Sequence, residues 1–299
     1  MAEAVPAAVS PPPRPSPLGA RPLVCAAIAA LTLWSLWVLG LELGDLLPGR
    51  SELRPLFRFL GAAFKPALVH TGVVPDGTPP LLLMVADSVR RTVVFAASGM
   101  SLALVASAGL GFLGSTAWWS RDAQAPCSAL RCWVQRTLRP FLYAVTRTLI
   151  ACMRSVHELI WALLLLAAVG LSETSAVIAI AIPFAGTLAK VFSEALDEAP
   201  RDAAEAMRGA GATPLQVTLF GLLPRALPDM SAYALYRFEC AVRSSAILGF
   251  FGLPTLGYHI RLEWGMADYR EVWTYLYALL LLVVLLDWWS GALRRRFVA

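Results

Sequence analysis

Three ionisable side chains interrupt an apolar stretch in the C-terminal third of the chain, within YALYRFECAVRSSAILG. Arg237, Glu239 and Arg243 are costly to bury in lipid, so each is a candidate for function. Glu239 and Arg243 are four residues apart and can pair on one helix face, whereas Arg237 is rotated toward another helix or a pathway. Arginine presents paired donors that suit a tetrahedral oxyanion, and Ser244 can add a hydroxyl. The cluster predicts either part of an anion pathway or an ion pair that holds helices together.

A second charged pair lies in the segment RSVHE, where Arg154 and Glu158 are again four residues apart. An ion pair that stabilises the helices is the favoured interpretation here, with contact to a translocated anion as the alternative. His157 lies beside the pair, but the chain has only 3 His, and its 5 Cys form no CxxC motif. These spacings predict neither a metal site nor a disulfide framework.

The composition places these charges in a membrane protein. The chain has 299 residues, of which 58% are hydrophobic and 15% charged, and its mean hydropathy is +0.64. Soluble domains are typically about 25% charged, so the composition argues against a soluble enzyme. Because every backbone amide needs a partner in lipid, we expect an all-α integral membrane protein. The apolar runs predict about six transmembrane helices, at residues 23–41, 91–114, 137–169, 173–196, 226–251 and 272–290.

Arginines that flank the predicted spans give an orientation. Arg14 and Arg21 precede the first span, four arginines lie in the 115–140 loop, and three follow the last span. Since positive charge favours the cytoplasmic side, both termini and the 197–225 segment are predicted to be cytoplasmic. The long 42–91 segment is basic but also acidic and follows this rule less well. The net charge of +5 therefore indicates which ends of the spans face the cytoplasm, and we expect no nucleic-acid partner.

The chain divides into four parts by composition. Residues 1–22 are rich in proline and alanine and predict a disordered tail. Residues 23–85 hold the first helix and an extracytoplasmic loop, residues 86–293 the main transmembrane domain, and residues 294–299 a basic cytoplasmic tail. The helix predicted at 91–114 is rich in Gly, Ala and Ser, so we expect it to pack closely against other helices.

The polar segment between the fourth and fifth predicted spans carries strong local signals. Pro200 should end the preceding helix, because it disfavours helical geometry at the residue before it. The run RDAAEAMRGAG then predicts a short helix with Ala203, Met207 and Ala210 on one face. That face is narrow and mostly alanine, which binds lipid poorly. We therefore expect this helix to dock in a groove of another protein rather than lie on the membrane surface.

Glycines and a capping sequence follow this short helix. Gly209 and Gly211 offer the positive φ that commonly ends a helix. Thr213 as N-cap, Pro214 at the first position and Gln216 at the third then predict a capping box and a new helix. The segment should form a helix, a tight turn and a second helix.

These residues also carry a family resemblance. Glu205-Ala206, Gly211 and the LLP that ends at Pro224 resemble the EAA…G…LP loop of ABC importer permeases, with Met207 in place of the usual alanine. The segment SAYALYRFECAVRSS is similar to phosphonate- and phosphate-type permeases, and the resemblance covers residues 90–290. It implies a type I ABC importer permease core with a coupling helix that docks in a separate ATPase. The implied coupling residues are Glu205, Ala206, Met207, Gly211, Leu223 and Pro224.

The resemblance further implies partners and a location. This chain has no GxxxxGK[ST] motif, so it is expected not to be an enzyme and to bind no cofactor, with ATP and Mg on cytoplasmic ATPase subunits. An extracytoplasmic binding protein would deliver a phosphonate- or phosphate-like oxyanion to a permease homodimer in the bacterial inner membrane. The segment GFFGLPTLGYH resembles the external gate of such permeases, with a plain loop as the alternative. The candidate pathway residues are Arg154, Glu158, Arg237, Glu239, Arg243 and Ser244.

Two other classes of membrane protein are the alternatives. An ion-coupled secondary transporter usually shows internal repeats and broken helices; we find no repeat, and only residues 137–169 suggest a broken helix. A membrane enzyme would need clustered His or paired carboxylates, and the three His are scattered. An ABC permease for a different small solute also remains an alternative.

Overall fold

The computed structural model describes residues 20–40, 50–72, 75, 77–119 and 138–297. Every secondary-structure element in these residues is a helix, which confirms the predicted all-α fold. The chain forms two compact units, Met1–Arg58 and Phe59–Ala299, which are described separately. The helices are α1 Ala20–Val38, α2 Arg50–Ala63, α3 Leu81–Gly114, α4 Thr116–Trp119, α6 Arg139–Ser155, α7 Glu158–Val169, α8 Glu173–Glu198, α9 Asp202–Gly209, α10 Pro214–Gln216, α11 Leu223–Ile247, α12 Leu256–Gly265 and α13 Tyr269–Phe297.

The first unit contains α1 and the beginning of α2. The side chains of α1 are exposed and mostly apolar. The apolar part of α1, residues 22–38, is shorter than the roughly 20 residues that a span needs, so the first predicted span stays a prediction. The tail predicted at residues 1–22 lies almost wholly outside the described residues, and α1 already begins at Ala20.

The second unit supplies counterparts for the other predicted spans. Three of its helices, α3, α8 and α13, are long and apolar enough to cross a membrane. Two bent pairs raise the count in the described residues to as many as five: α6 with α7, bent by 92°, and Pro214–Phe251 with α12, bent by 44°. The predicted break within residues 137–169 is thus confirmed. The span predicted at residues 91–114 lies within α3, which begins ten residues earlier, at Leu81.

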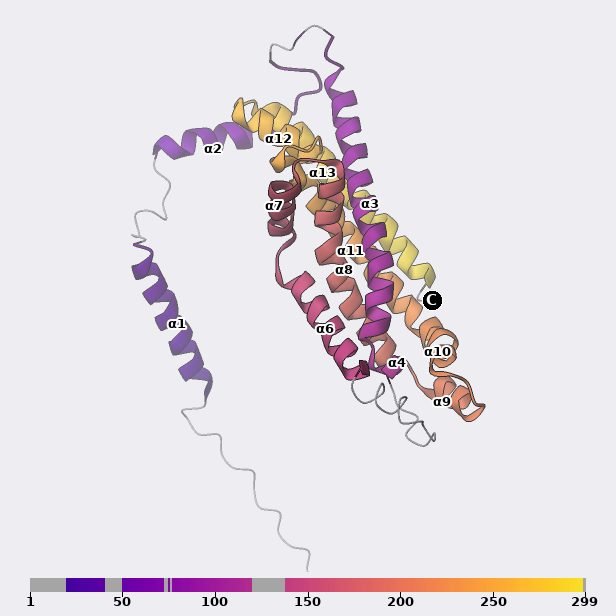
Figure 1. Cartoon of the computed structure of the whole chain (residues 1–299). Coiled ribbons are helices and arrows are strands. Elements are labelled where there is room, and N and C mark those ends of the chain that lie inside the picture. The colour runs from indigo at the N-terminus through magenta and orange to yellow at the C-terminus, as the bar shows by residue number, and fades with distance from the viewer. Residues whose placement is uncertain (1–19, 41–49, 73–74, 76, 120–137, 298–299) are drawn as a thin grey trace, which may run out of the picture. The chain divides into compact units, whose positions relative to one another are not determined.

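Small residues let α3 pack tightly along α8, as the composition of α3 predicted (Figure 1). A Cβ atom built on Gly99 would lie 2.8 Å from Ile180 Cγ2, and one built on Gly111 would lie 2.9 Å from Phe192 Cβ. No larger side chain fits at either position without moving α8. Such close approach is how helices associate where lipid gives no hydrophobic drive.

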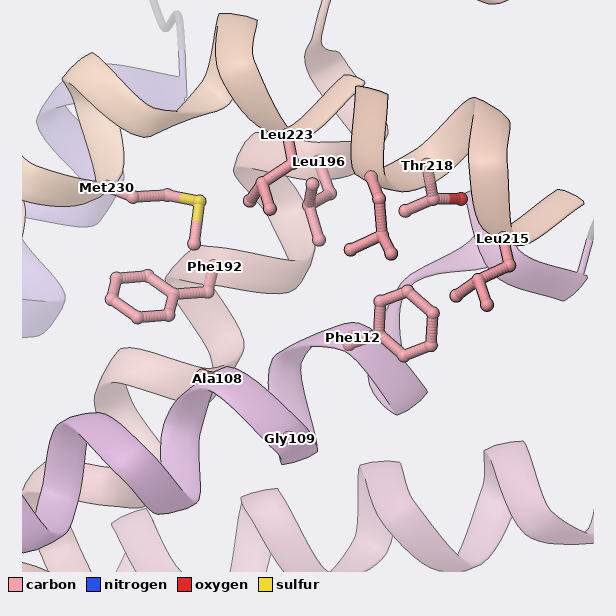
Figure 2. Close-up of a pocket in the computed structure, with 10 residues that line it drawn as sticks. Ala108, Gly109, Phe112, Phe192, Leu196, Leu215, Thr218, Leu223 and Met230 are labelled. Carbon is pink, nitrogen blue, oxygen red and sulfur yellow. The ribbon is translucent and has the colours of Figure 1, made fainter. Parts of the chain in front are cut away.

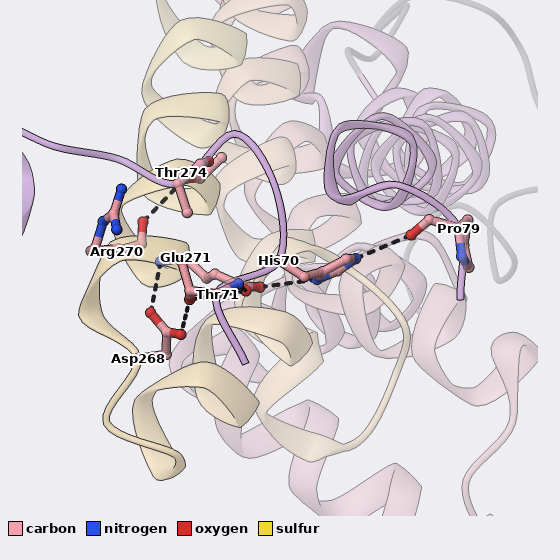
Figure 3. Close-up of polar contacts among 8 residues, drawn as sticks. His70, Thr71, Pro79, Asp268, Arg270, Glu271 and Thr274 are labelled. Atoms are coloured by element: carbon pink, nitrogen blue, oxygen red, sulfur yellow. Dashed lines mark hydrogen bonds and ion pairs between the residues drawn. The ribbon is translucent and has the colours of Figure 1, made fainter. Parts of the chain in front are cut away.

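The end of the bundle that carries α12 is clasped by the segment that precedes α3 (Figures 1 and 3). Glu271, at the start of α13, is only 4% exposed. It accepts a hydrogen bond from the Thr71 backbone N–H at 2.8 Å and lies 3.5 Å from His70 Nδ1. The Thr71 hydroxyl also bonds Asp268, and Thr274 donates to the Ala67 carbonyl at 2.7 Å. These contacts hold residues 67–71 against α13.

The predicted interruption after α11 is present. A 3-10 turn at Leu248–Phe251 leads to Gly252, whose φ of 105° ends the turn, and α12 begins at Leu256. Seven of the eleven residues of GFFGLPTLGYH are therefore helical, three in the 3-10 turn and four in α12, so the segment is not a plain loop. Thr92 of α3 anchors this junction, because its hydroxyl accepts from the Leu256 N–H at 3.1 Å.

Candidate functional site

The segment 199–222 joins α8 to α11 and folds as predicted. Ala199 leaves helical geometry with φ −56° and ψ 139°, directly before Pro200. The short helix α9 follows, then a turn in which Gly211 has φ +85°. The capping box is confirmed: Gln216 N–H donates to Thr213 Oγ1 at 3.4 Å, and Thr213 N–H donates to Gln216 Oε1 at 2.9 Å. A π-helical turn, Val217–Leu222, completes the segment.

The prediction for Gly209 was wrong. Gly209 is the last residue of α9 and lacks positive φ, whereas Gly211 alone in this turn adopts the left-handed region. One left-handed residue suffices, because the Gly211 N–H already bonds the Arg208 carbonyl at 2.9 Å and closes the helix end.

Part of the α9 face that was expected to dock on a partner packs on this chain instead: Ala203 and Met207 are half-buried, whereas Ala210 is exposed. Ala204 is 2% exposed. A Cβ built on Gly221 would lie 3.3 Å from Met207 Sδ and 3.4 Å from Ala204 Cα. Arg225 adds an ion pair with Asp202 at 3.8 Å. The apolar stripe is therefore used to fold α9 onto the π-helical turn.

The outward face of α9 carries two of the other predicted coupling residues, and two more are exposed near it in sequence. Glu205 and Ala206 are exposed, as are Gly211 in the turn and Pro224 in the first turn of α11. Leu223 is half-buried and points into the molecule. Six residues predicted as one group thus divide between an outward surface and an inward support.

A largely apolar cavity of about 350 Å³ lies beneath this segment (Figure 2). Side chains of the segment and of α11 line one wall and face residues of α3 and α8 on the other. No ion pair crosses this cavity among the residues that line it, so the segment contacts the bundle there by apolar surfaces. The lining residues are Ala108, Gly109, Phe112, Phe192, Leu196, Leu215, Thr218, Leu219, Leu223 and Met230.

Asp197, which the sequence analysis did not single out, anchors the same end of α8. Its carboxylate accepts from Ser115 Oγ at 2.7 Å and from the Ala117 N–H at 3.1 Å, and lies 3.9 Å from Arg147. An acidic residue at the end of an apolar helix could have marked Asp197 as a site residue. Its partners, however, come from distant parts of the sequence and could not be predicted.

The predicted ion pair between Glu239 and Arg243 is confirmed, with Arg243 Nη2 at 2.6 Å from Glu239 Oε1. The two side chains differ in burial: that of Glu239 is 11% exposed and that of Arg243 is 52% exposed. The carboxylate is therefore held inside the helix packing, while the guanidinium reaches the surface of this chain. This geometry leaves donors of Arg243 available to a ligand.

The predicted ion pair between Arg154 and Glu158 was wrong. Arg154 lies in the last turn of α6 and Glu158 begins α7, and the 92° bend between the two helices removes the four-residue relation. Glu158 instead accepts a hydrogen bond from Ser244 Oγ at 3.0 Å. Ser244 is 6% exposed, so this bond links α7 to α11 in a buried place.

Arg237 points to another helix, as predicted. Its Nε donates to the Tyr233 hydroxyl at 3.0 Å, and its guanidinium lies 5.9 Å from the centre of the Phe184 ring on α8. Such a cation–π contact stabilises a charge without neutralising it. The structure thus joins Glu158 of α7 to Ser244 of α11, pairs Glu239 with Arg243 within α11, and leaves Arg154 exposed at the bend.

Comparisons with known proteins agree with this architecture. Residues 132–299 match the family described as binding-protein-dependent transport system inner membrane component. The phosphite transport system permease protein PtxC of Stutzerimonas stutzeri is 36% identical over 158 residues, which is 53% of this chain and 58% of that protein. The phosphate-import permease protein PhnE of Mycolicibacterium smegmatis is 28% identical over 171 residues, 57% of this chain and 29% of that protein.

The fold itself resembles a solved transporter. An inward-facing structure of the MetNI methionine ABC transporter superposes with a TM-score of 0.58 at 23% identity, covering 74% of this chain and 99% of that chain. The chain spans 58% and 29% of the lengths of the two curated relatives.

Proposed function

This chain belongs to the family of binding-protein-dependent transport system inner membrane components, and we propose that it is the transmembrane permease of an ATP-driven importer for a phosphorus oxyanion. The observation that carries the proposal is the segment 199–222. It projects a short, rigidly capped helix from the end of α8 and α11, and its outward face is not used by this chain.

The segment 199–222 is suited to transmit force from a cytoplasmic ATPase. Met207 and Ala204 fix α9 to the π-helical turn, so a push on Glu205 and Ala206 moves the whole segment. The apolar cavity beneath it lets the segment shift against α3 and α8 without breaking an ion pair. The movement passes directly into α11, which follows the turn. This helix carries Arg237, Glu239, Arg243 and Ser244, here called the charge cluster.

The charge cluster is suited to a passing anion. Arg243 holds its position through Glu239, yet half of its side chain remains exposed. Partial neutralisation by Glu239 weakens the attraction for an oxyanion, so that the anion can leave again. Phosphite, phosphate and phosphonate share the tetrahedral oxygen arrangement that guanidinium donors fit, and two relatives are named for phosphite and phosphate transport.

The remaining assignments follow from the family. We infer two copies of this chain with two ATPase subunits that bind ATP and Mg, and an extracytoplasmic protein that delivers the anion. The protein lies in the bacterial inner membrane with both termini in the cytoplasm. The chain itself has no P-loop sequence, so we assign ATP hydrolysis to the ATPase subunits.

Reconstitution tests the proposal. The chain is co-expressed with a candidate ATPase and binding protein, and the purified complex is placed in liposomes with labelled phosphite, phosphate or methylphosphonate outside. We expect uptake that requires ATP and the binding protein and that vanadate stops. A complex whose ATPase carries an inactivated P-loop lysine is the control. Uptake that an ion gradient drives without ATP would overturn the proposal in favour of a secondary transporter.

A further inference from the structure

A second cavity, of about 370 Å³, lies at the opposite end of α8 from the segment 199–222. One wall is a face of α3 and the other is the first turns of α8. Unlike the apolar cavity of Figure 2, it has charged side chains in its lining, together with hydroxyl and apolar ones. The lining residues are Arg90, Arg91, Val94, Phe95, Ser98, Glu173, Thr174 and Val177.

The length of α3 places this cavity at the membrane surface. At about 1.5 Å per residue, the part of α3 from Arg91 to its end covers roughly 36 Å, slightly more than the roughly 30 Å of a hydrocarbon core. The preceding turns, with Arg90 and Asp87, therefore project beyond the hydrocarbon. Since the other end of α8 leads to the proposed ATPase contact, the cavity opens on the extracytoplasmic side.

One carboxylate is shared by both arginines of the cavity. Asp87 Oδ1 accepts from Arg90 Nε at 3.2 Å and Nη2 at 2.7 Å, and Asp87 Oδ2 accepts from Arg91 Nε at 2.8 Å. Within the described part of the chain, the Arg91 side chain donates a hydrogen bond only through Nε. Its two terminal nitrogens, Nη1 and Nη2, can therefore bind a ligand. The side chains of Arg90 and Arg91 are 66% and 38% exposed, and ion pairs as exposed as these exchange easily for another anion.

We propose that this cavity binds a tetrahedral phosphorus oxyanion, with Arg90 and Arg91 as donors, before the anion enters the bundle. Ser98 and Thr174 add hydroxyl groups to the walls, while Glu173 and Asp87 offset the positive charge and keep the binding weak. The role as an entry site for substrate rests on the proposed function. The binding itself does not, and a lipid headgroup is the other source of the same chemistry.

Two opposite substitutions make the inference testable. Arg91→Gln removes a charged donor, and we expect phosphate to bind at least about tenfold more weakly. Asp87→Asn keeps the shape of the side chain but releases both guanidinium groups from their anion, and we expect binding to tighten by about tenfold. A merely structural role for Asp87 predicts no tightening. Arg261→Gln is the matched control, since Arg261 is an exposed arginine of α12 that is not part of the cavity wall.

The experiment measures equilibrium binding of labelled inorganic phosphate to the full-length chain in a maltoside detergent, after phospholipid has been removed. Gel filtration verifies that each variant is folded. Equal binding by wild type, Arg91→Gln and Asp87→Asn would overturn the inference. In a second arm, phosphatidylglycerol is added to the micelles; displacement of phosphate by stoichiometric lipid would assign the cavity to a headgroup and overturn its role in substrate entry. Neither arm uses transport, so a failure of ATP-driven uptake is distinguishable from a failure of this site.

Discussion

The segment 199–222 and the charge cluster on α11 are built from contacts of very different sequence separation. In the segment, Thr213 caps Gln216 three residues away, and Met207 packs on Gly221. In the cluster, Glu158 meets Ser244 across 86 residues, and Arg237 lies on Phe184 of another helix. The first region can keep its shape while it moves as a unit. The contacts of the charge cluster change whenever α7, α8 and α11 shift against one another, and such a change is what a transport pathway needs.

The largest expected effect separates a pathway role of Arg243 from a structural one. Arg243→Ala should abolish uptake, because the anion loses its cationic partner. The substitution also leaves the carboxylate of Glu239 without its ion pair in a mostly buried place, which typically costs about 3–5 kcal/mol. Uptake and assembly must therefore be measured together.

The double variant Glu239→Gln/Arg243→Gln removes that penalty, because both charges disappear. We expect it to assemble with the ATPase and to resist heat like the wild type, but to show no uptake in liposomes. Wild-type uptake by the double variant would show that the ion pair only joins turns of the helix.

A contact with the ATPase on the outward face of α9 gives the next largest effect. Ala206→Trp adds a large side chain at an exposed position, so the fold of this chain should be unchanged. In a fitted groove the same side chain should prevent docking. We expect the ATPase to be lost from affinity purification, while Ala86→Trp, an exposed alanine on α3, retains it. Full ATPase recovery with Ala206→Trp would place the contact elsewhere.

The same contrast explains what could be predicted from the sequence. Short-range contacts explain the correct predictions, because they involve neighbours only a few residues away. Pro200 gave the C-terminal end of α8, and the capping box of Thr213 and Gln216 gave the N-terminal start of α10. The pair of Arg154 and Glu158 failed because the four-residue rule assumes one continuous helix, and the bend at residues 156–157 breaks it. The sequence suggested a break within residues 137–169, but no local pattern placed it between Arg154 and Glu158.

Burial explains the remaining misses. The apolar face of α9 was identified only in part: Met207 packs on the π-helical turn of the same chain, but Ala204, the most buried residue of α9, was not assigned to that face, and Ala210 is exposed. Gly221 is the residue that permits this contact, and in the sequence it looks like any glycine in an apolar run. Arg90, Asp87 and Arg91 were interpreted only as charges that flank a span. The cavity that the two arginines line forms between α3 and α8, so the sequence of α3 alone could not indicate it.

A moderate effect is expected from the hydrogen bond that joins α7 to α11. Ser244→Ala removes the hydroxyl that donates to Glu158 at 3.0 Å, in a place where little water can replace it. We expect the free energy of unfolding to fall by about 1–2 kcal/mol, seen as a lower thermal midpoint in detergent. Ser101→Ala is the control, because Ser101 is exposed and donates only within its own helix, to the Ser98 carbonyl. Equal midpoints for the two variants would show that the bond between the helices contributes nothing.

The smallest effect concerns the two glycines that follow α9, and here the signs should be opposite. Gly211 has φ +85°, where a side chain is strained, so Gly211→Ala should destabilise the segment by about 1 kcal/mol. Gly209 is helical, and a Cβ built there meets nothing within 4 Å, so Gly209→Ala should stabilise α9 by roughly 0.5–1 kcal/mol. Protease susceptibility of the segment in the detergent-purified chain measures both, since local opening exposes the backbone to cleavage. Changes of the same sign would mean that the turn does not depend on a left-handed residue at Gly211. The segment 199–222 would then lack the rigid local geometry that sets it apart from the charge cluster.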